Sequence, residues 1–186
     1  MVLPIVCYGN NVLKKLCHPI SPNDSEIEKL IADMWETLEI ADGCGLAAPQ
    51  VNVPVKLFIV NSRDTYLNMN KNQRREYFDG DEGIKETFIN AEIVEYANDL
   101  ITIDEEGCLS IPNIYEAVKR PWKITIKYHD AQFQEHIQTF SGYTARVIQH
   151  EYDHTMGVLY TELINPLRKQ LLRNKLSRIQ REISRV

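Results

Sequence analysis

The sequence predicts an α+β fold with mainly antiparallel sheets packed around a central helix, followed by a C-terminal helix. The middle of the chain is rich in β-branched and aromatic residues, whereas apolar residues at helical spacing occur at three separated places. Strands gathered in the middle, rather than alternating with helices one by one, favour antiparallel pairing. The 186 residues suffice for a sizeable core, so we expect a single catalytic domain over 1–186.

The first elements are a helix over 25–42 and a short buried strand over 55–60. Ser25 and Glu28 have the spacing of a capping box at the start of this helix. Its apolar residues fall on one stripe: Ile27, Leu30, Ile31, Met34 and Leu38. The polar stretch 61–86 shows no period and is too long for an ordinary loop, so we interpret it as an insertion.

Four strands are expected in the middle of the chain, at 87–96, 100–104, 122–128 and 132–140. The last two alternate apolar and polar residues and are joined by His129-Asp130-Ala131, which indicates a hairpin. The helical pattern returns at Ser141 and ends at Gly157. These elements would surround one central helix.

A basic amphipathic helix is expected over 166–185, opened by Asn165-Pro166. Its apolar face would contain Leu167, Leu171, Leu172, Leu176, Ile179 and Ile183. Seven of the 21 Lys and Arg residues but only one of the 26 Asp and Glu residues lie in 167–186, so a tail of charge +6 follows a body of charge −11. Such asymmetry suggests a tail that meets an anionic partner, or a solvated helix face.

Composition excludes several classes of protein. No apolar run approaches the roughly 20 residues of a membrane span, and residues 1–7 lack the basic start of a secretory signal. The four cysteines are too few and scattered for a disulfide framework. We therefore expect reduced thiols in a cytosol, with a metal-binding role for at least one of them.

The strongest chemical motif is Gln-His-Glu-Tyr-Asp-His at 149–154. On a helix, His150 and His154 share a face and can present two imidazole nitrogens to one metal ion. Glu151 would lie beside them, placed to take a proton from a water molecule at the metal. The alternative is two ordinary histidines on a helix.

The third ligand decides the class of metal site. A metzincin protease would carry a histidine six residues after His154, but Tyr160 stands there. The remaining downstream candidates are Glu162 and Glu182, and the latter lies in the basic tail. The downstream sequence therefore offers no clear ligand.

Cys108 is the better candidate, because it ends a strand directly after Gly107 and a thiolate is a good ligand for first-row metals. Three protein ligands would leave one coordination position open for catalysis. Cys108 could instead be a buried inert thiol, or Cys44 could join it and the two histidines in a closed structural site.

Small residues are dense at 43–50, Gly-Cys-Gly-Leu-Ala-Ala-Pro-Gln, where a substrate backbone could approach closely. Gln50 would offer a side-chain amide to a developing oxyanion. On its own the segment is equally consistent with a helix end and a turn.

Together the three segments resemble the three motifs of the peptide deformylases: Gly-x-Gly-Leu-Ala-Ala-Pro-Gln, Glu-Gly-Cys-Leu-Ser and Gln-His-Glu-x-x-His, in this order. The resemblance covers nearly the whole chain, from 8–13 through 88–93 to a terminal helix like that of the type 1 bacterial enzymes. It implies a metal-dependent hydrolase of protein biosynthesis that removes the formyl group from the N-terminal formyl-methionine of new polypeptides and releases formate.

The resemblance also implies roles for individual residues. The ligands of Fe²⁺, which Zn²⁺, Ni²⁺ or Co²⁺ can replace, would be Cys108, His150 and His154. Glu151 would be the general base and acid, with Gln50 and the backbone N–H of Leu109 as oxyanion donors. The methionine pocket and peptide groove would be lined by Cys44, Gly45, Tyr143, Arg146 and Val147. Glu106 would lie beside that pocket, in a buried salt bridge with Arg120.

Partners and location follow from the same resemblance. Formyl-methionyl nascent chains would be the substrates, and the C-terminal helix would dock on the ribosome, with no membrane partner and no specific nucleic-acid recognition. The protein would be cytoplasmic, in a bacterium. Two departures from the family's pattern, Tyr115 near the groove and Arg146 in the pocket, affect the preference for side chains beyond methionine.

Overall fold

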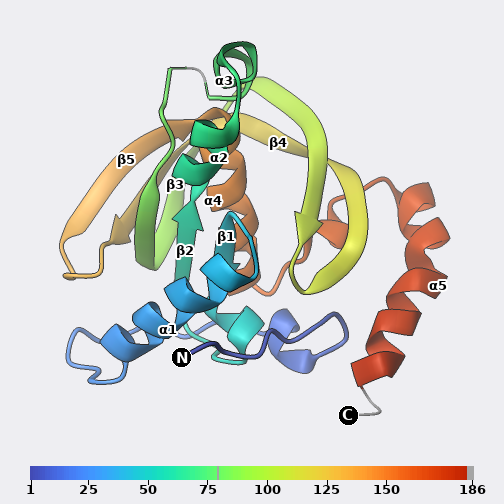
Figure 1. The fold of residues 1–186 in the computed structure, drawn as a ribbon, viewed down its shortest axis with the longest axis horizontal. Helices are drawn as coiled ribbons and strands as arrows, with labels where there is room; N and C mark the ends of the chain where they lie inside the picture. The colour runs from blue at the N-terminus through green and yellow to red at the C-terminus, as the bar shows by residue number, and fades with distance from the viewer. Residues whose placement is uncertain (79, 184–186) are drawn as a thin grey trace.

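The computed structural model describes residues 1–78 and 80–183, and the strands in these residues form one five-stranded antiparallel sheet (Figure 1). The strands follow one another in space as in sequence: β1 Gly45–Ala47, β2 Leu57–Asn61, β3 Lys85–Cys108, β4 Ile111–His129 and β5 Glu135–Ser141. Each pairs antiparallel with the next. The predicted α+β class with an antiparallel sheet is confirmed.

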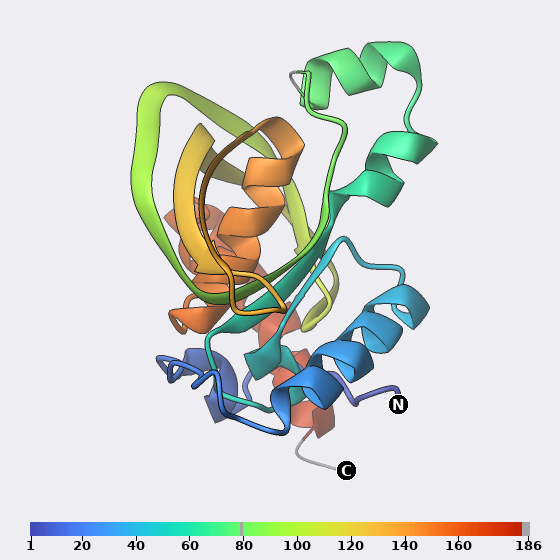
Figure 2. The same ribbon diagram turned by 90° about the vertical axis from the view of Figure 1, so that its left-hand side faces the viewer.

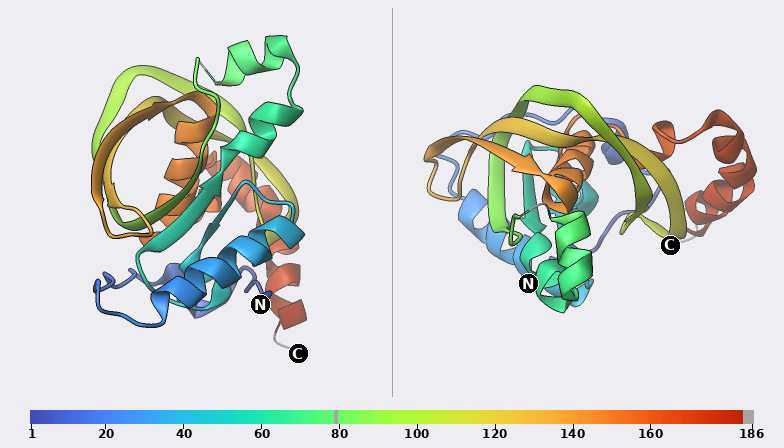
Figure 3. Two further views of the ribbon diagram at one scale, coloured as in Figure 1. Left: turned by 60° about the vertical axis from the view of Figure 1, so that its left-hand side comes forward. Right: turned by 90° about the horizontal axis from the view of Figure 1, so that it is seen from above.

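β3 and β4 form a long hairpin that arches over the molecule (Figure 3). Two separate strands were expected at 87–96 and 100–104, but both belong to β3. The register shifts between Ala97 and Ile101, so the polar residues that suggested a break lie at a bulge. A bulge bends a strand without ending its pairing, which explains the difference.

The long helices are α1 Ile27–Ile40, α4 Gly142–Thr155 and α5 Pro166–Ile183, with 3-10 turns η1 Asn11–Lys14, η2 Ala48–Val51 and η3 Tyr160–Glu162. The capping box expected at Ser25 and Glu28 is wrong. The N-cap of α1 is Glu26, which makes no side-chain capping bond. Instead, the backbone N–H of Glu26 donates to the Asp24 carboxylate, 3.1 Å away, so a turn before the helix satisfies this amide.

The polar stretch 61–86 is not an irregular loop. It contains two short helices, α2 Ser62–Asn68 and α3 Lys71–Tyr77, which project from one end of the sheet (Figure 2). Asn61 and Asn70 cap them: the side chain of Asn61 accepts one hydrogen bond from a backbone N–H of the first turn, and that of Asn70 accepts two. Helices of seven residues are too short to show a period of apolar side chains, which is why the pattern missed them.

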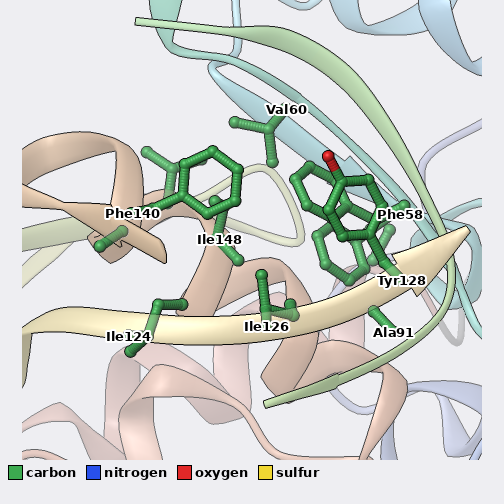
Figure 4. Close-up of a cluster of buried hydrophobic side chains, with 12 residues drawn as sticks. Phe58, Val60, Ala91, Ile124, Ile126, Tyr128, Phe140 and Ile148 are labelled. Atoms are coloured by element: carbon green, nitrogen blue, oxygen red, sulfur yellow. The ribbon is translucent and has the colours of Figure 1, made fainter. Parts of the chain in front are cut away.

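The catalytic-motif helix α4 lies inside the curve of the sheet, as predicted for the central helix (Figure 1). Its apolar side packs against aromatic and aliphatic side chains of β2 to β5 (Figure 4). Phe88 contacts the rings of Phe58, Tyr128 and Phe140 in this cluster. Nearly every residue of α4 up to Glu151 is buried, so the helix has little freedom to move.

The C-terminal helix α5 packs along a narrower stripe than expected. Leu172 and Leu176 are buried beside the β3–β4 turn, whereas Leu167 and Leu171 are 71% and 70% exposed. The predicted apolar stripe is therefore wrong for these two leucines. The side chain of Ile183 lies outside the described residues, as do residues 184–186. Of the helices described, none is both long and apolar enough to cross a membrane.

Candidate active site and metal centre

His150 and His154 lie one turn apart on α4, facing Cys108 at the end of β3. Their ligand atoms all lie within 4.8 Å of one another, and Sγ of Cys108 is 3.3 Å from Nε2 of His154. Both histidines are buried. Two imidazoles and a thiol directed at one point are a donor set that suits first-row divalent metals, so these residues fit the metal that the motif predicts.

A carboxylate, that of Glu106, contacts one ring nitrogen of His150. Its Nδ1 lies 3.0 Å from Oε2 of Glu106, which leaves the other ring nitrogen for a metal. Metal-binding histidines usually have such a partner, because it orients the ring and selects the tautomer. Although burial opposes it, hydrogen bonds from His150 and Arg120 keep the pKa of Glu106 well below its usual range.

Glu106 is the centre of a buried charge network. Arg120 binds both of its oxygens, at 2.6 and 2.9 Å, and Arg146 binds one at 2.7 Å. Arg120 also reaches Asp153 at 2.8 Å, and Arg146 donates to the carbonyl of Thr102. The Glu106–Arg120 pair expected from the resemblance is present, but the sequence carries no pattern that shows Arg146 or Asp153 joining it.

Glu151 projects beside the two histidines and is 4% exposed. Its Oε2 has no hydrogen-bond partner among the described residues, and burial raises the pKa of the carboxyl to about 7. Gly45 makes room for it, because a Cβ there would lie 2.5 Å from Oε1. A carboxyl in such surroundings can take up and release a proton near neutral pH.

Gln50 lies beside Cys108. Its Oε1 accepts a hydrogen bond from the Ala47 N–H at 2.8 Å, which orients the amide. Nε2 then lies 3.5 Å from the sulfur of Cys108 and 3.3 Å from the hydroxyl of Ser110. The amide donor is thus fixed beside the candidate metal position.

A cavity of about 1110 Å³ opens onto this centre, and we call it the catalytic cavity. The predicted site residues that line it are Cys44, Gly45, Gln50, Glu106, Cys108, Leu109, Tyr143, Arg146, Val147, His150 and Glu151. His154 does not line it and is only 1% exposed. The structure therefore brings the whole predicted set to one place.

Two of the alternatives for further ligands, Cys44 and Glu162, find no support in the geometry, and the side chain of the third, Glu182, lies outside the described residues. Cys44 does not belong to the ligand group within 4.8 Å, and its thiol contacts the hydroxyl of Tyr143. Glu162 is engaged by Lys14 and by the backbone N–H of Leu159. Within the described residues, three ligands converge and a closed site with Cys44 is absent.

Tyr160 contacts the site in a way that the sequence did not predict. In the sequence it only occupies the position at which a metzincin has its third histidine. In the structure its ring stacks on that of His150, with the ring centroids 5.9 Å apart. Its hydroxyl donates to the carbonyl of Ile114 at 2.9 Å. A tyrosine this buried needs such a partner, but the sequence could not reveal which one.

The family model described as Polypeptide deformylase matches residues 2–170. The chain belongs to the polypeptide deformylase family. It is therefore a metal-dependent hydrolase that removes the N-formyl group from newly made polypeptides, as the resemblance implied.

Curated relatives and solved structures agree with this assignment. The chain is 44% identical to the peptide deformylase of Flavobacterium psychrophilum over 179 residues, covering 96% of this chain and 91% of that protein. The peptide deformylase of Thermus thermophilus superposes with a TM-score of 0.82 at 31% identity, covering 98% and 99% of the two chains. A class I type b enzyme of Acinetobacter baumannii bound to Met-Ala-Ser gives a TM-score of 0.75 at 31% identity, covering 88% and 99%.

Proposed function

We propose that Cys108, His150 and His154 hold Fe²⁺ in the working enzyme, and that Zn²⁺, Ni²⁺ or Co²⁺ can replace it. The observation that carries this proposal is the convergence of the three ligand atoms beside an unpartnered, buried carboxylate oxygen of Glu151. When bound, a divalent ion supplies Lewis-acid activation of the water and of the formyl carbonyl.

Glu151 is the general base and acid of this proposal. It takes a proton from the attacking water and later returns it to the leaving amine nitrogen. Its pKa of about 7, raised by burial, suits both transfers at neutral pH. Nε2 of Gln50 and the backbone N–H of Leu109 donate hydrogen bonds to the formyl oxygen as it becomes an oxyanion.

The methionine side chain enters the catalytic cavity where Cys44, Gly45, Tyr143, Arg146 and Val147 line it. Glu106 also borders the cavity, but both of its oxygens are bound to Arg120, Arg146 and His150. We therefore assign Glu106 to positioning of His150 rather than to direct contact with the substrate.

An anaerobic assay of formate release from formyl-Met-Ala-Ser tests the reaction. The enzyme is expected to release one formate per peptide and to leave the unformylated peptide intact. Cleavage of the unformylated peptide without formate would instead indicate an endopeptidase of the zincin type. That outcome would contradict the proposed reaction.

The metal proposal predicts a dependence on air. Fe²⁺ beside the Cys108 thiolate is readily oxidised, whereas Ni²⁺ is not. Activity of the iron form is therefore expected to decay within an aerobic incubation that the nickel form survives. Parallel measurement of formate release and metal content checks this, and equal decay of both forms would contradict it.

The C-terminal helix is proposed to dock on the ribosome in the cytoplasm of a bacterium. Lys169, Arg173 and Arg181 are exposed on α5, whereas Leu172 and Leu176 are buried. Exposed cations on one helix favour an anionic surface such as ribosomal RNA. Contact with phosphates would need no specific base recognition.

Replacing these three cations with glutamine is expected to weaken ribosome binding about tenfold, measured by co-sedimentation at several salt concentrations. Removing the helix altogether is a poorer test, since it would uncover Leu172 and Leu176 and break the pair of Arg168 with the buried Glu116. Hydrolysis of small formyl peptides serves as the control. Unchanged co-sedimentation would contradict ribosome binding by α5 and would indicate that its cations form only a solvated helix face.

A further inference from the structure

Three groups border the imidazole ring of His150. Oε2 of Glu106 lies 3.0 Å from its Nδ1, and the ring of His154 is nearly perpendicular to it, with the centroids 5.0 Å apart. The third group is Tyr160, whose ring is inclined by only 27° to that of His150, with the centroids 5.9 Å apart. This separation lies within the range of stacked aromatic pairs. Tyr160 therefore lies along a face of the imidazole, whereas Glu106 contacts its edge.

Tyr160 is itself fixed in place. It is 1% exposed, and its hydroxyl donates to the backbone carbonyl of Ile114 on β4. The turn η3 that carries it is closed by Glu162, whose carboxylate accepts a hydrogen bond from the backbone N–H of Leu159 at 3.0 Å and pairs with Lys14. A buried ring with a bonded hydroxyl and a closed turn beneath it has little freedom to rotate.

The ring of Tyr160 also belongs to an apolar cluster that extends from α5 to the metal ligands. Leu172 and Leu176 of α5 are buried members of this cluster, and Cys108 packs against it. Two of the three ligands, Cys108 and His150, therefore contact the same packed unit. Close packing in such a unit resists displacement of any one side chain.

The hydrogen bond to Glu106 does not fix the plane of the imidazole by itself. A hydrogen bond weakens steeply only when its angle falls below about 120°, so the ring of His150 could tilt while Nδ1 keeps its partner. Such a tilt would displace Nε2, the nitrogen that is left for a metal. The ring of Tyr160 opposes the tilt, because any change of plane either separates the two rings or forces them together.

We propose that Tyr160 is a positioning residue of the metal centre, whose ring holds the imidazole of His150 in the plane that binds the metal. This inference rests on the ligand set of the proposed function. Tyr160 does not line the catalytic cavity, so it acts through His150 and not on the substrate. The position that supplies a third histidine ligand in metzincins supplies here a support for the first histidine.

Two variants separate the ring of Tyr160 from its hydroxyl. Tyr160→Leu and Tyr160→Phe both leave the carbonyl of Ile114 without its partner, but only phenylalanine keeps the ring. In the Co²⁺-loaded proteins, visible absorption bands report the geometry of the ligands. Transfer of Co²⁺ to an excess of chelator reports how firmly the ligands hold it.

The leucine variant is expected to shift the Co²⁺ bands and to lose Co²⁺ about tenfold faster than the parent chain, as when other groups that orient metal ligands are removed. The phenylalanine variant should keep the bands and lose Co²⁺ within about twofold of the parent rate. Tyr160→Met, which replaces the ring with a flexible chain, is a second replacement without a ring and should resemble the leucine variant.

Hydrolysis of formyl-Met-Ala-Ser gives an independent readout. Because Tyr160 does not line the catalytic cavity, the leucine variant should lower kcat about tenfold and leave KM within about twofold of the parent value. A residue of the substrate site would instead change KM.

Leu172→Ala is the matched control for a loss of packing, since Leu172 is buried in the same cluster but belongs to α5. It should lower the urea midpoint while keeping the Co²⁺ bands and the rate of metal loss. Parent-like bands and metal loss in the leucine and methionine variants would overturn the inference and leave the ligand set standing. A phenylalanine variant as impaired as the leucine variant would do the same, whereas a parent chain that binds no Co²⁺ would overturn both.

Discussion

Replacing Glu151 with glutamine is expected to lower kcat for formyl-Met-Ala-Ser by about 10³-fold, within the range that a general acid–base group contributes. Glutamine keeps the shape of the side chain in the space beside Gly45 but can neither accept nor return the proton. Stopped assays of formate release with the metal-loaded, anaerobic enzyme measure the effect.

Stability and metal content separate this loss from unfolding. Burial disfavours the charged form of Glu151, so a neutral amide is not expected to reduce the free energy of unfolding. The variant should therefore bind metal and unfold in urea like the parent chain. Activity that survives in a metal-loaded Glu151→Gln variant would contradict the role of this residue as the base.

Replacing Glu106 with glutamine is expected to destabilise the protein by about 3 kcal/mol and to weaken metal binding by about 10- to 100-fold. The buried guanidinium of Arg120 would keep only Asp153 as a charged partner, and Arg146 would keep only neutral acceptors. His150 would also lose the carboxylate that orients its ring. Urea unfolding of the metal-free protein and competition with a chelator measure the two effects separately.

Glu105→Gln is the matched control for Glu106. Its side chain is adjacent in sequence but exposed, so its stability and metal affinity should match those of the parent chain. A Glu106→Gln variant with unchanged metal affinity would show that Glu106 does not position His150. If the Glu106→Gln variant were less stable but bound metal as tightly as the parent chain, the charge network at Glu106 would have a structural role only.

The periodicity of apolar residues predicted the helices correctly where a helix is long enough to show several repeats. The spacing of Ile31, Met34 and Leu38 placed α1, and the same kind of pattern placed α4 and most of α5. It failed for α2 and α3, which last two turns each and are set by asparagine caps and by contacts with α4. It also failed at the bulge of β3, since a change of register leaves no clear trace in an alternating sequence.

The α5 stripe shows the limit of periodicity in another way. Leu167 and Leu172 both fit a helical apolar face, but only Leu172 meets the body. Which part of a broad apolar face is covered depends on where the helix docks. The pair of Arg168 with the buried Glu116 contributes to that docking, and spacing along the chain does not encode it.

The sequence by itself determined the chemistry: two histidines four residues apart with a glutamate between them, a thiol after Gly107 and a glutamine after a run of small residues. These are local facts, because backbone geometry fixes where neighbours in a helix point. Only the tertiary structure decided what surrounds them. The network at Glu106, the ring of Tyr160 on His150 and the contact of α2 with α4 join residues 10 to 82 positions apart. Such contacts depend on packing, because most buried polar and charged groups pair with whichever groups the folded chain brings beside them.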